Sequence, residues 1–268
     1  MAPLADRMVA LNKRDPSGLR SDEDAQASEM RRIISDGIAR ATASIINREV
    51  TDPVEVDVIL SKEIEGDTQS RLLISELKSV NKTVSKSMTR TDRLLGRMGI
   101  ELGPQGIDGD VVSAIEVNVT NDVKSLTASA RAECSRAITD AIGRGLGTKD
   151  MGKMITEATG ESRNRAETIA RTTMAKTFND IAVNRYQRSG VTEYNIYPTK
   201  DGRLCEKCMK AALDGNKFRR YTSPPPLPIH PNCRCIPYPI IPGEDSDLEF
   251  SAYILSPKKR IVAWLEAI

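Results

Sequence analysis

A cluster of cysteines and a histidine constrains the fold of this 268-residue chain more than any other sequence feature. Four of its five cysteines and its single histidine fall in two motifs, Cys-x2-Cys and His-x2-Cys-x-Cys, separated by 21 residues. These residues are Cys205, Cys208, His230, Cys233 and Cys235. Zinc takes four thiolate or imidazole ligands in a tetrahedron, and a Cys-x2-Cys turn supplies two of them. The spacing therefore predicts a structural Zn²⁺ site completed by the second motif.

Five donors compete for four positions, and the pattern does not decide between Cys233 and Cys235. Two other uses of these residues remain open, a redox pair at Cys205 and Cys208 or a set of two disulfides. Disulfides are typical of extracellular proteins, and a redox Cys-x2-Cys needs no distant His-x2-Cys partner. A catalytic zinc keeps one open position, which so many nearby thiolates disfavour. We therefore expect the metal to stabilise the fold.

Four blocks of residues in and before the motifs resemble, in order and spacing, the phage Mu F-like head morphogenesis family of minor capsid proteins. The blocks are Arg165–Thr173, Thr199–Cys208, Leu213–Gly215 and Pro226–Cys235. The resemblance covers roughly residues 146–240. One departure is Thr173, which stands where the family usually carries a glutamate. A role that depends on this acid is therefore not carried over to this chain.

The resemblance implies a role in head morphogenesis without enzymatic activity. The implied protein enters the procapsid in a few copies and lies in the virion interior near the genome, after assembly in the host cytoplasm. The implied partners are the portal protein, other capsid or scaffold proteins and packaged DNA, contacted non-specifically, with no membrane partner. Two alternatives remain, a zinc-stabilised nucleic-acid-binding module and a domain associated with a toxin or processing enzyme. A single histidine placed in the metal motif leaves no Ser/His/Asp constellation for the enzyme alternative.

Composition favours helices, because aromatic residues make up only 4% of the chain and charged residues 28%. An amphipathic helix is expected to start near Ser21 and to end before Asp52-Pro53. Its apolar positions recur at steps of three and four; they are Ala27, Met30, Ile34, Ile38, Ala41 and Ile45. Residues 54–60 alternate between apolar and polar, which is typical of a strand, although the run is too short to decide alone.

Two long segments carry apolar seams with steps of four and three. The first seam comprises Leu73, Leu77, Val80, Val84, Met88, Thr91, Leu95 and Met98. The second comprises Val112, Ile115, Val119, Val123, Leu126, Ala130, Cys134, Ala137 and Ala141. A turn rich in helix breakers, Gly103–Gly109, separates them. We therefore predict a long antiparallel helical hairpin within an elongated helical N-terminal region, residues 1–145, with Cys134 as a core residue.

A change of composition after Gly147 predicts a small α+β zinc-stabilised C-terminal domain over residues 146–242. A short helix after Thr148 and a longer one from about Ser162 to Gly190 should precede a strand at Val191–Tyr197. Residues 243–268 are expected to be a linker and an apolar tail that docks on a partner or packs back on its own domain. The whole chain is thus predicted to be mainly α.

The chain is nearly neutral, with a formal charge of +2, but charge is locally biased. Residues 163–220 hold 13 basic and 6 acidic side chains, a balance of +7. Three arginines of this stretch, and one in the second motif, are candidates for contact with nucleic acid or a partner, or else ordinary surface charges: Arg165, Arg171, Arg203 and Arg234. No run of 18 apolar residues occurs and no charged-then-apolar leader follows Met1, so we expect neither a membrane span nor a secretory signal.

Overall fold

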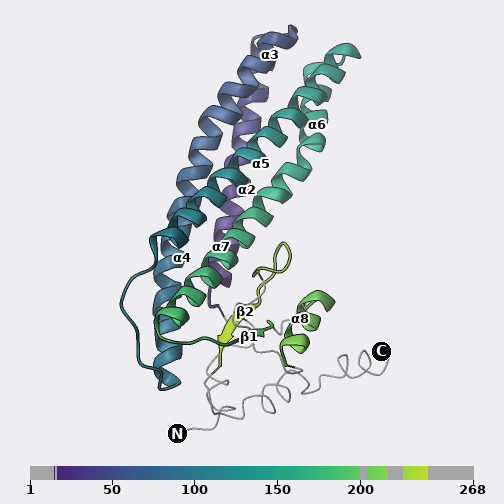
Figure 1. The fold of residues 1–268 in the computed structure, drawn as a ribbon. Coiled ribbons are helices and arrows are strands. Elements are labelled where there is room, and N and C mark those ends of the chain that lie inside the picture. Colours follow the sequence, from purple (N-terminus) through teal and green to yellow (C-terminus); the bar gives the residue numbers. More distant parts are fainter. Residues whose placement is uncertain (1–14, 16, 200–203, 217–225, 241–268) are drawn as a thin grey trace, which may run out of the picture. The chain divides into compact units, whose positions relative to one another are not determined.

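The computed structural model describes residues 15, 17–199, 204–216 and 226–240 (Figure 1). The described residues form two compact units, each assembled from separate parts of the chain. Unit 2 comprises Arg20–Thr83 and Gly109–Met174; unit 1 comprises the described residues of Met1–Leu19, Val84–Asp108 and Ala175–Ile268. The prediction of a mainly helical protein is confirmed. The predicted domain limits at 145 and 242 stay predictions, and the expected linker and tail, residues 243–268, lie outside the described residues.

Unit 2 is built from helices whose apolar stripes meet in one core. Helix α2 (Arg20–Asn47) buries all six predicted positions, and α5 (Gly109–Gly143) buries its predicted seam except Val112, which is exposed. Helix α6 (Thr148–Ala158) and the first half of α7 (Gly160–Arg188) complete the core with Ile155, Ala166 and Ala170. Helical periodicity alone therefore identified most of this core.

Residues 54–60 form helix α3 (Pro53–Leu60), so the strand-like reading of this segment was wrong. The Asp52 side chain caps the helix by accepting a hydrogen bond from the Val54 N–H at 3.1 Å, and Pro53 occupies the first turn, where its missing N–H costs nothing. Val56 and Leu60 turn inward at helical spacing, whereas Val54 stays exposed. The alternating apolar pattern thus reflects one buried and one exposed face of a short helix.

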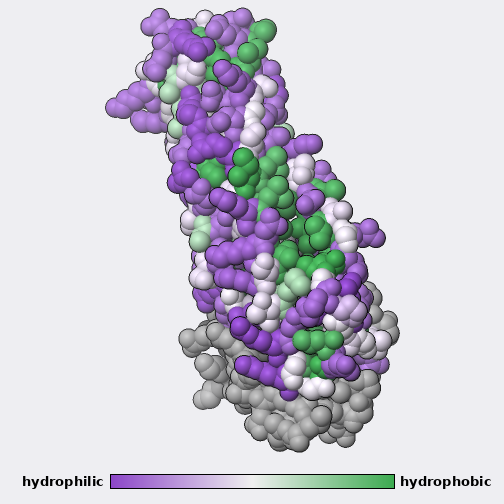
Figure 2. Space-filling view, turned by 90° about the vertical axis from the view of Figure 1, so that its left-hand side faces the viewer, coloured by the Kyte–Doolittle hydropathy of each residue, from purple (hydrophilic) through white to green (hydrophobic). Residues whose placement is uncertain are grey.

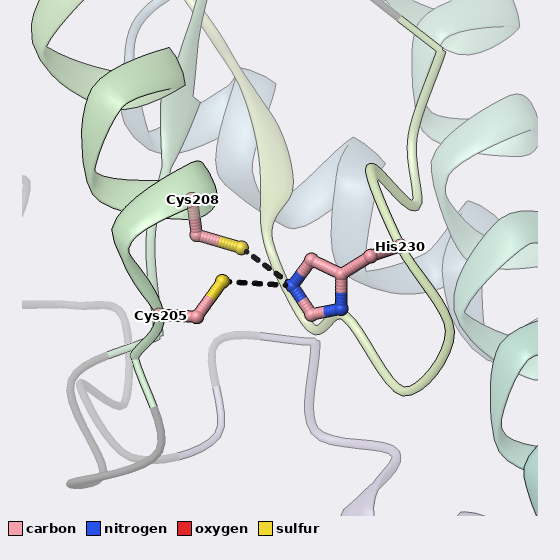
Figure 3. A group of neighbouring side chains, drawn as sticks. All are labelled: Cys205, Cys208 and His230. Atoms are coloured by element: carbon pink, nitrogen blue, oxygen red, sulfur yellow. Dashed lines mark hydrogen bonds between the residues drawn. The ribbon is translucent and has the colours of Figure 1, made fainter.

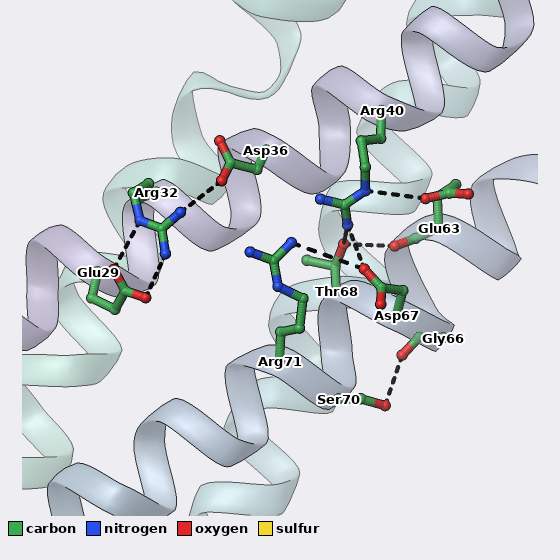
Figure 4. A network of polar contacts seen from close by, with 10 residues as sticks. All are labelled: Glu29, Arg32, Asp36, Arg40, Glu63, Gly66, Asp67, Thr68, Ser70 and Arg71. Atoms are coloured by element: carbon green, nitrogen blue, oxygen red, sulfur yellow. Dashed lines mark hydrogen bonds and ion pairs between the residues drawn. The ribbon is translucent and has the colours of Figure 1, made fainter.

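Helix α3 continues without a break into a π-helical segment, η1 (Ser61–Thr68), and then into α4 (Gln69–Arg97). Figure 4 shows how α2 packs on this segment: Arg40 donates to Asp67 at 2.6 Å and to Glu63 at 3.3 Å. The Thr68 hydroxyl donates to the Glu63 carbonyl, five residues earlier, at 2.6 Å. Thr68 is fully buried against Gly37 of α2, where a Cβ would lie 2.0 Å from its Oγ1. A side chain at position 37 would therefore collide with η1.

Helix α4 is rotated relative to the predicted seam. Val80, Thr91, Leu95 and Met98 are buried as expected, but the other four predicted residues, Leu73, Leu77, Val84 and Met88, are only half-buried. Polar side chains take their place inside the protein: Glu76, Thr83 and Ser87. Apolar spacing could not reveal this, because a polar residue is buried where other segments supply hydrogen-bond partners. Glu76, for example, accepts from Gln26 of α2 at 2.7 Å.

Unit 1 contains a two-stranded antiparallel sheet of β1 (Tyr194–Tyr197) and β2 (Ile236–Pro239), with Tyr194 opposite Pro239. Helix α8 (Glu206–Asn216) packs beside β1. The strand expected at Val191–Tyr197 is therefore present in shorter form, whereas sequence reasoning missed β2. Two prolines in a four-residue strand suppress the usual strand signal, since proline cannot donate to a ladder.

The connection between α4 and α5 is held against the end of α7. Arg185 is fully buried; it pairs with Asp92 at 2.7 Å and donates to the Pro104 carbonyl at 2.7 Å. Arg188 pairs with Asp108 at 2.5 Å. These two basic residues in the last turn of α7 therefore hold the predicted turn against this helix.

Hydrophobic side chains gather on one face of the molecule between hydrophilic ones (Figure 2). The exposed large hydrophobic residues of unit 2 are Val54, Val58, Ile74, Val112 and Val117. In the part of the chain that the structure describes, every helix is too short or too polar to cross a lipid bilayer.

Candidate metal centre

The two motifs meet in unit 1 because local structure brings their turns together. Cys205 directly precedes α8 and Cys208 lies in its first turn. The second motif forms the turn that leads into β2, with Cys235 directly before Ile236. Since β2 pairs with β1, and β1 packs beside α8, the sheet places one motif against the other.

The donor atoms form two triads that share one sulfur. Cys205, Cys208 and His230 make the first triad, and Cys208, Cys233 and Cys235 the second, with the atoms of each triad within 4.8 Å of one another. Figure 3 shows the first: His230 Nε2 lies 3.1 Å from Cys205 Sγ and 3.0 Å from Cys208 Sγ. Cys208 Sγ lies 3.5 Å from Cys233 Sγ. The structure thus brings together all five predicted ligands.

Within the two triads, three donor distances can be compared with the edges of a zinc tetrahedron. With Zn–S near 2.3 Å and Zn–N near 2.0–2.1 Å, a tetrahedron has S···S edges of about 3.8 Å and S···N edges of about 3.6 Å. The observed separations of 3.0 to 3.5 Å are slightly shorter. Cys233 and Cys235 belong to the second triad and not to the first, so a fourth ligand would have to move toward Cys205 and His230 to complete the tetrahedron.

The second motif also presents its histidine in the form that a metal requires. His230 Nδ1 lies 2.8 Å from the Pro231 carbonyl, which can only accept, so this nitrogen carries the proton and Nε2 offers its lone pair to the centre. The Cys233 N–H donates to the His230 carbonyl at 3.0 Å, and Asn232 adopts a positive φ of 60°. This tight turn brings His230 and Cys233 to the same point.

The cysteines lie in an apolar environment. Cys208, Cys233 and Cys235 are buried in a cluster with Ile196 and Leu227. Hydrogen bonding from the Cys208 thiol lowers the pKa of the Cys233 thiol. All five cysteines of the chain are free, so the structure does not contain the two disulfides that were considered as an alternative to metal binding. Several thiolates in such a site need a cation nearby, because burial of unpaired charge is costly.

Two side chains that the metal prediction did not single out support the second motif. Asn179 of α7 donates from its amide to the Cys235 carbonyl at 3.1 Å, and the Thr199 hydroxyl donates to the Arg234 carbonyl at 2.6 Å. Together these two hydrogen bonds hold the backbone at Arg234 and Cys235 in position. The sequence could have pointed to Thr199, because it is the first residue of one of the four motif blocks. No sequence feature pointed to Asn179.

The candidate arginines belong to different parts of the chain: Arg165 and Arg171 to unit 2, and Arg234 to unit 1. Arg165 donates to the hydroxyls of Ser125 and Ser129 at 2.8 and 2.9 Å, and Arg171 pairs with Glu167 and Asp24. Arg234 is half-buried in the second motif, and Arg203 lies outside the described residues. Their role in binding nucleic acid or a partner stays a prediction.

Cys134 lies apart from the metal cluster. It is fully buried in the core of unit 2, where burial raises the pKa of its thiol to about 12. Its prediction as a core residue is confirmed.

Comparison with known proteins agrees with the motif blocks. Residues 132–237 match the family described as Phage Mu protein F like protein. The chain is also 27% identical, over 170 residues, to an uncharacterized protein of Haemophilus influenzae. That match covers 58% of this chain and 37% of the relative, so the chain spans little more than a third of the curated relative's length. No solved structure matches the chain.

Proposed function

We propose, on the premise that residues 132–237 are a phage Mu F-like region, that this chain is a phage head morphogenesis protein with a structural zinc site. The observation that carries the proposal is that the family match contains the two donor triads, which share Cys208. The two cysteine motifs lie near the end of the matched region, and a bound metal would join them. This explains why the family blocks include both motifs.

The zinc ligands in this proposal are Cys205, Cys208, His230 and Cys233. Cys208 belongs to both triads, and Cys233 lies on the same tight turn as His230 and 3.5 Å from Cys208. Cys235 then remains a buried neighbouring thiol. When bound, zinc would supply a cross-link between α8 and the turn before β2. With three thiolates and one imidazole the coordination is closed, which favours a structural over a catalytic role and a protein without enzymatic activity.

Assignment of the fourth ligand can be tested by comparing Cys233→Ser with Cys235→Ser. We expect Cys233→Ser to lower the zinc content of the purified full chain well below one per chain, and Cys235→Ser to leave it unchanged. The reverse result would make Cys235 the ligand. Loss of zinc in both variants would instead indicate an exchange between the two thiolates.

The biological part of the proposal is incorporation into a procapsid in a few copies, in association with the portal protein, inside the shell and near the genome. The partners are then the portal, other capsid or scaffold proteins, and packaged DNA. Support for this part comes from the family match alone.

The test is co-expression of the full chain with the portal, scaffold and major capsid proteins of its own phage. Purified particles are analysed by quantitative mass spectrometry, and particles lacking portal serve as the control. We expect a few copies per particle that are lost when the portal is omitted. Absence of the chain from portal-containing particles would contradict the proposal, even if the protein binds zinc.

A further inference from the structure

The second half of α4 carries an unusual concentration of positive charge. Between Val84 and Arg97 there are four basic residues, Lys86, Arg90, Arg93 and Arg97, and one acid, Asp92. Asp92 already forms an ion pair with the buried Arg185, at 2.7 Å. This half of the helix carries no other acid, and Lys86 has a partner of its own.

The three arginines share one side of the helix. Their spacing of three and then four residues places them within an arc of about 60°, over about 10 Å of helix axis. Arg93 and Arg97 are exposed and Arg90 is half-buried. Among the residues that the structure describes, none of the three makes an ion pair, in contrast to Arg171.

Arg90 is also held in a defined position. Its guanidinium lies across Gly18, which has a φ of +67°, so closely that a Cβ at position 18 would fall 1.6 Å from Nη1. The nearby Asp15 carboxylate accepts hydrogen bonds from the Gly18 N–H at 2.7 Å and from the Ser17 hydroxyl at 3.2 Å. The backbone of Gly18 therefore limits the freedom of this arginine before any ligand arrives.

We propose that Arg90, Arg93 and Arg97, here named the α4 arginine stripe, bind the phosphodiester backbone of a nucleic acid without reading its sequence. Arginine presents a planar fork of donors that matches phosphate oxygens. The length of the stripe corresponds to about three phosphate steps of one strand, at about 3.4 Å each along the duplex axis. The stripe lies outside residues 132–237, and the inference does not depend on the metal centre.

A nucleic acid fits this surface better than an acidic protein helix. A partner helix is usually recognised through apolar anchors at helical spacing. Two exposed neighbours of the arginines on the helix are instead small, Thr89 and Gly96, and a Cβ added at Gly96 would meet nothing within 4 Å. Leu94 and Leu95 are buried and offer no anchor. Such an open and polar surface allows a backbone of phosphates to approach closely but offers no apolar anchor.

The test uses the full, zinc-loaded chain and a fluorescein-labelled 30-base-pair duplex, with binding followed by anisotropy over a series of salt concentrations. We expect R93Q/R97Q to reduce the slope of log K against log salt by about 1.8, since each phosphate contact contributes about 0.9. The matched control is K62Q/K124Q, which removes two exposed lysines of unit 2 and the same net charge. It should leave the slope unchanged.

Three results would overturn the proposal. The first is wild-type protein that does not bind the duplex, and the second is an equal loss of slope in the two double variants. The third is displacement of the duplex by poly-glutamate at equal charge concentration, which would assign the stripe to an acidic protein. Two duplexes of unrelated sequence should bind equally, because contacts to the backbone carry no sequence information.

Discussion

Among single side chains, Cys208 is the position on which the zinc proposal depends most, because both triads include it. Cys208→Ser should abolish stoichiometric zinc binding and expose residues 204–240 to proteolysis, since structural zinc contributes on the order of 10 kcal/mol in small domains. Zinc content and limited proteolysis measure the two effects. Cys134→Ala is the matched control: it removes a buried thiol of unit 2, should cost on the order of 1 kcal/mol and should keep the metal. Equal zinc in the two variants would be inconsistent with Cys208 as a ligand.

Glu76 is a buried carboxyl whose ionisation opposes folding. Burial raises its pKa to about 7; hydrogen bonds from Gln26 and Thr173 offset part of the rise, and the Asp122 charge adds to it. Because this pKa lies above that of an unfolded glutamate, about 4.3, the carboxyl's contribution to stability is complete below pH 4 and is lost as the pH rises to about 7.

The change to test is Glu76→Gln, which keeps the shape and a hydrogen-bonding partner for Gln26. Between pH 4.5 and 7.5 the wild-type free energy of unfolding should fall, relative to the variant, by an amount on the order of 3 kcal/mol. Urea unfolding at the two pH values gives this difference, and groups that titrate in both proteins cancel. Parallel pH profiles for the two proteins would show that Glu76 is not the titrating group.

Gly37 is required by the close approach of α2 to η1. Gly37→Ala should destabilise the chain by about 1–3 kcal/mol, because the new Cβ would collide with the Thr68 hydroxyl. Gly152→Ala in α6 is the control, with no atom within 4 Å of the added Cβ, and should stabilise by up to about 1 kcal/mol. Thermal unfolding of both variants provides the comparison. Destabilisation by Gly152→Ala of the same size would point to a general effect of alanine and not to this contact.

At the level of helices and their contacts, η1 is held from two sides by arginines. Arg40 on α2 binds Glu63 and Asp67, and Arg131 on α5 binds Asp57 through both oxygens and Glu65 at 2.6 Å. A π-helix has poorer intrinsic geometry than an α-helix and persists where its surroundings favour it. These ion pairs, with the Thr68 hydroxyl bond, are the interactions that retain it.

Arg131→Gln should therefore cost more than an ordinary surface arginine. We expect a loss of about 1–2 kcal/mol in unfolding free energy that shrinks at 1 M salt, because the pair is bidentate and partly buried. Arg144→Gln, which breaks an exposed pair with Asp140, should cost less than about 0.5 kcal/mol. A loss in Arg131→Gln no larger than that of Arg144→Gln would remove the argument that η1 is retained by its ion pairs.

Across the chain as a whole, the sequence allowed most helices to be predicted, because periodic apolar spacing is a local property. The structure also brings the five predicted donor residues together, while their binding of a metal stays a prediction. The strand-like reading of residues 54–60 failed because the neighbouring Asp52 caps a helix there. The α4 seam failed where distant segments decide, since partners from α2 and α7 allow α4 to bury Glu76. The short strand β2 exists only because β1 is there to pair with it.

The central claim is that one zinc ion joins the two cysteine motifs of unit 1. The direct measurement is metal content by elemental analysis of the full chain purified without added metal, combined with a count of reactive thiols before and after addition of a chelator. The claim predicts one zinc per chain and at least three thiols that become reactive only after chelation. Protein that holds no metal, with all four motif cysteines immediately reactive or joined in disulfides, would contradict it.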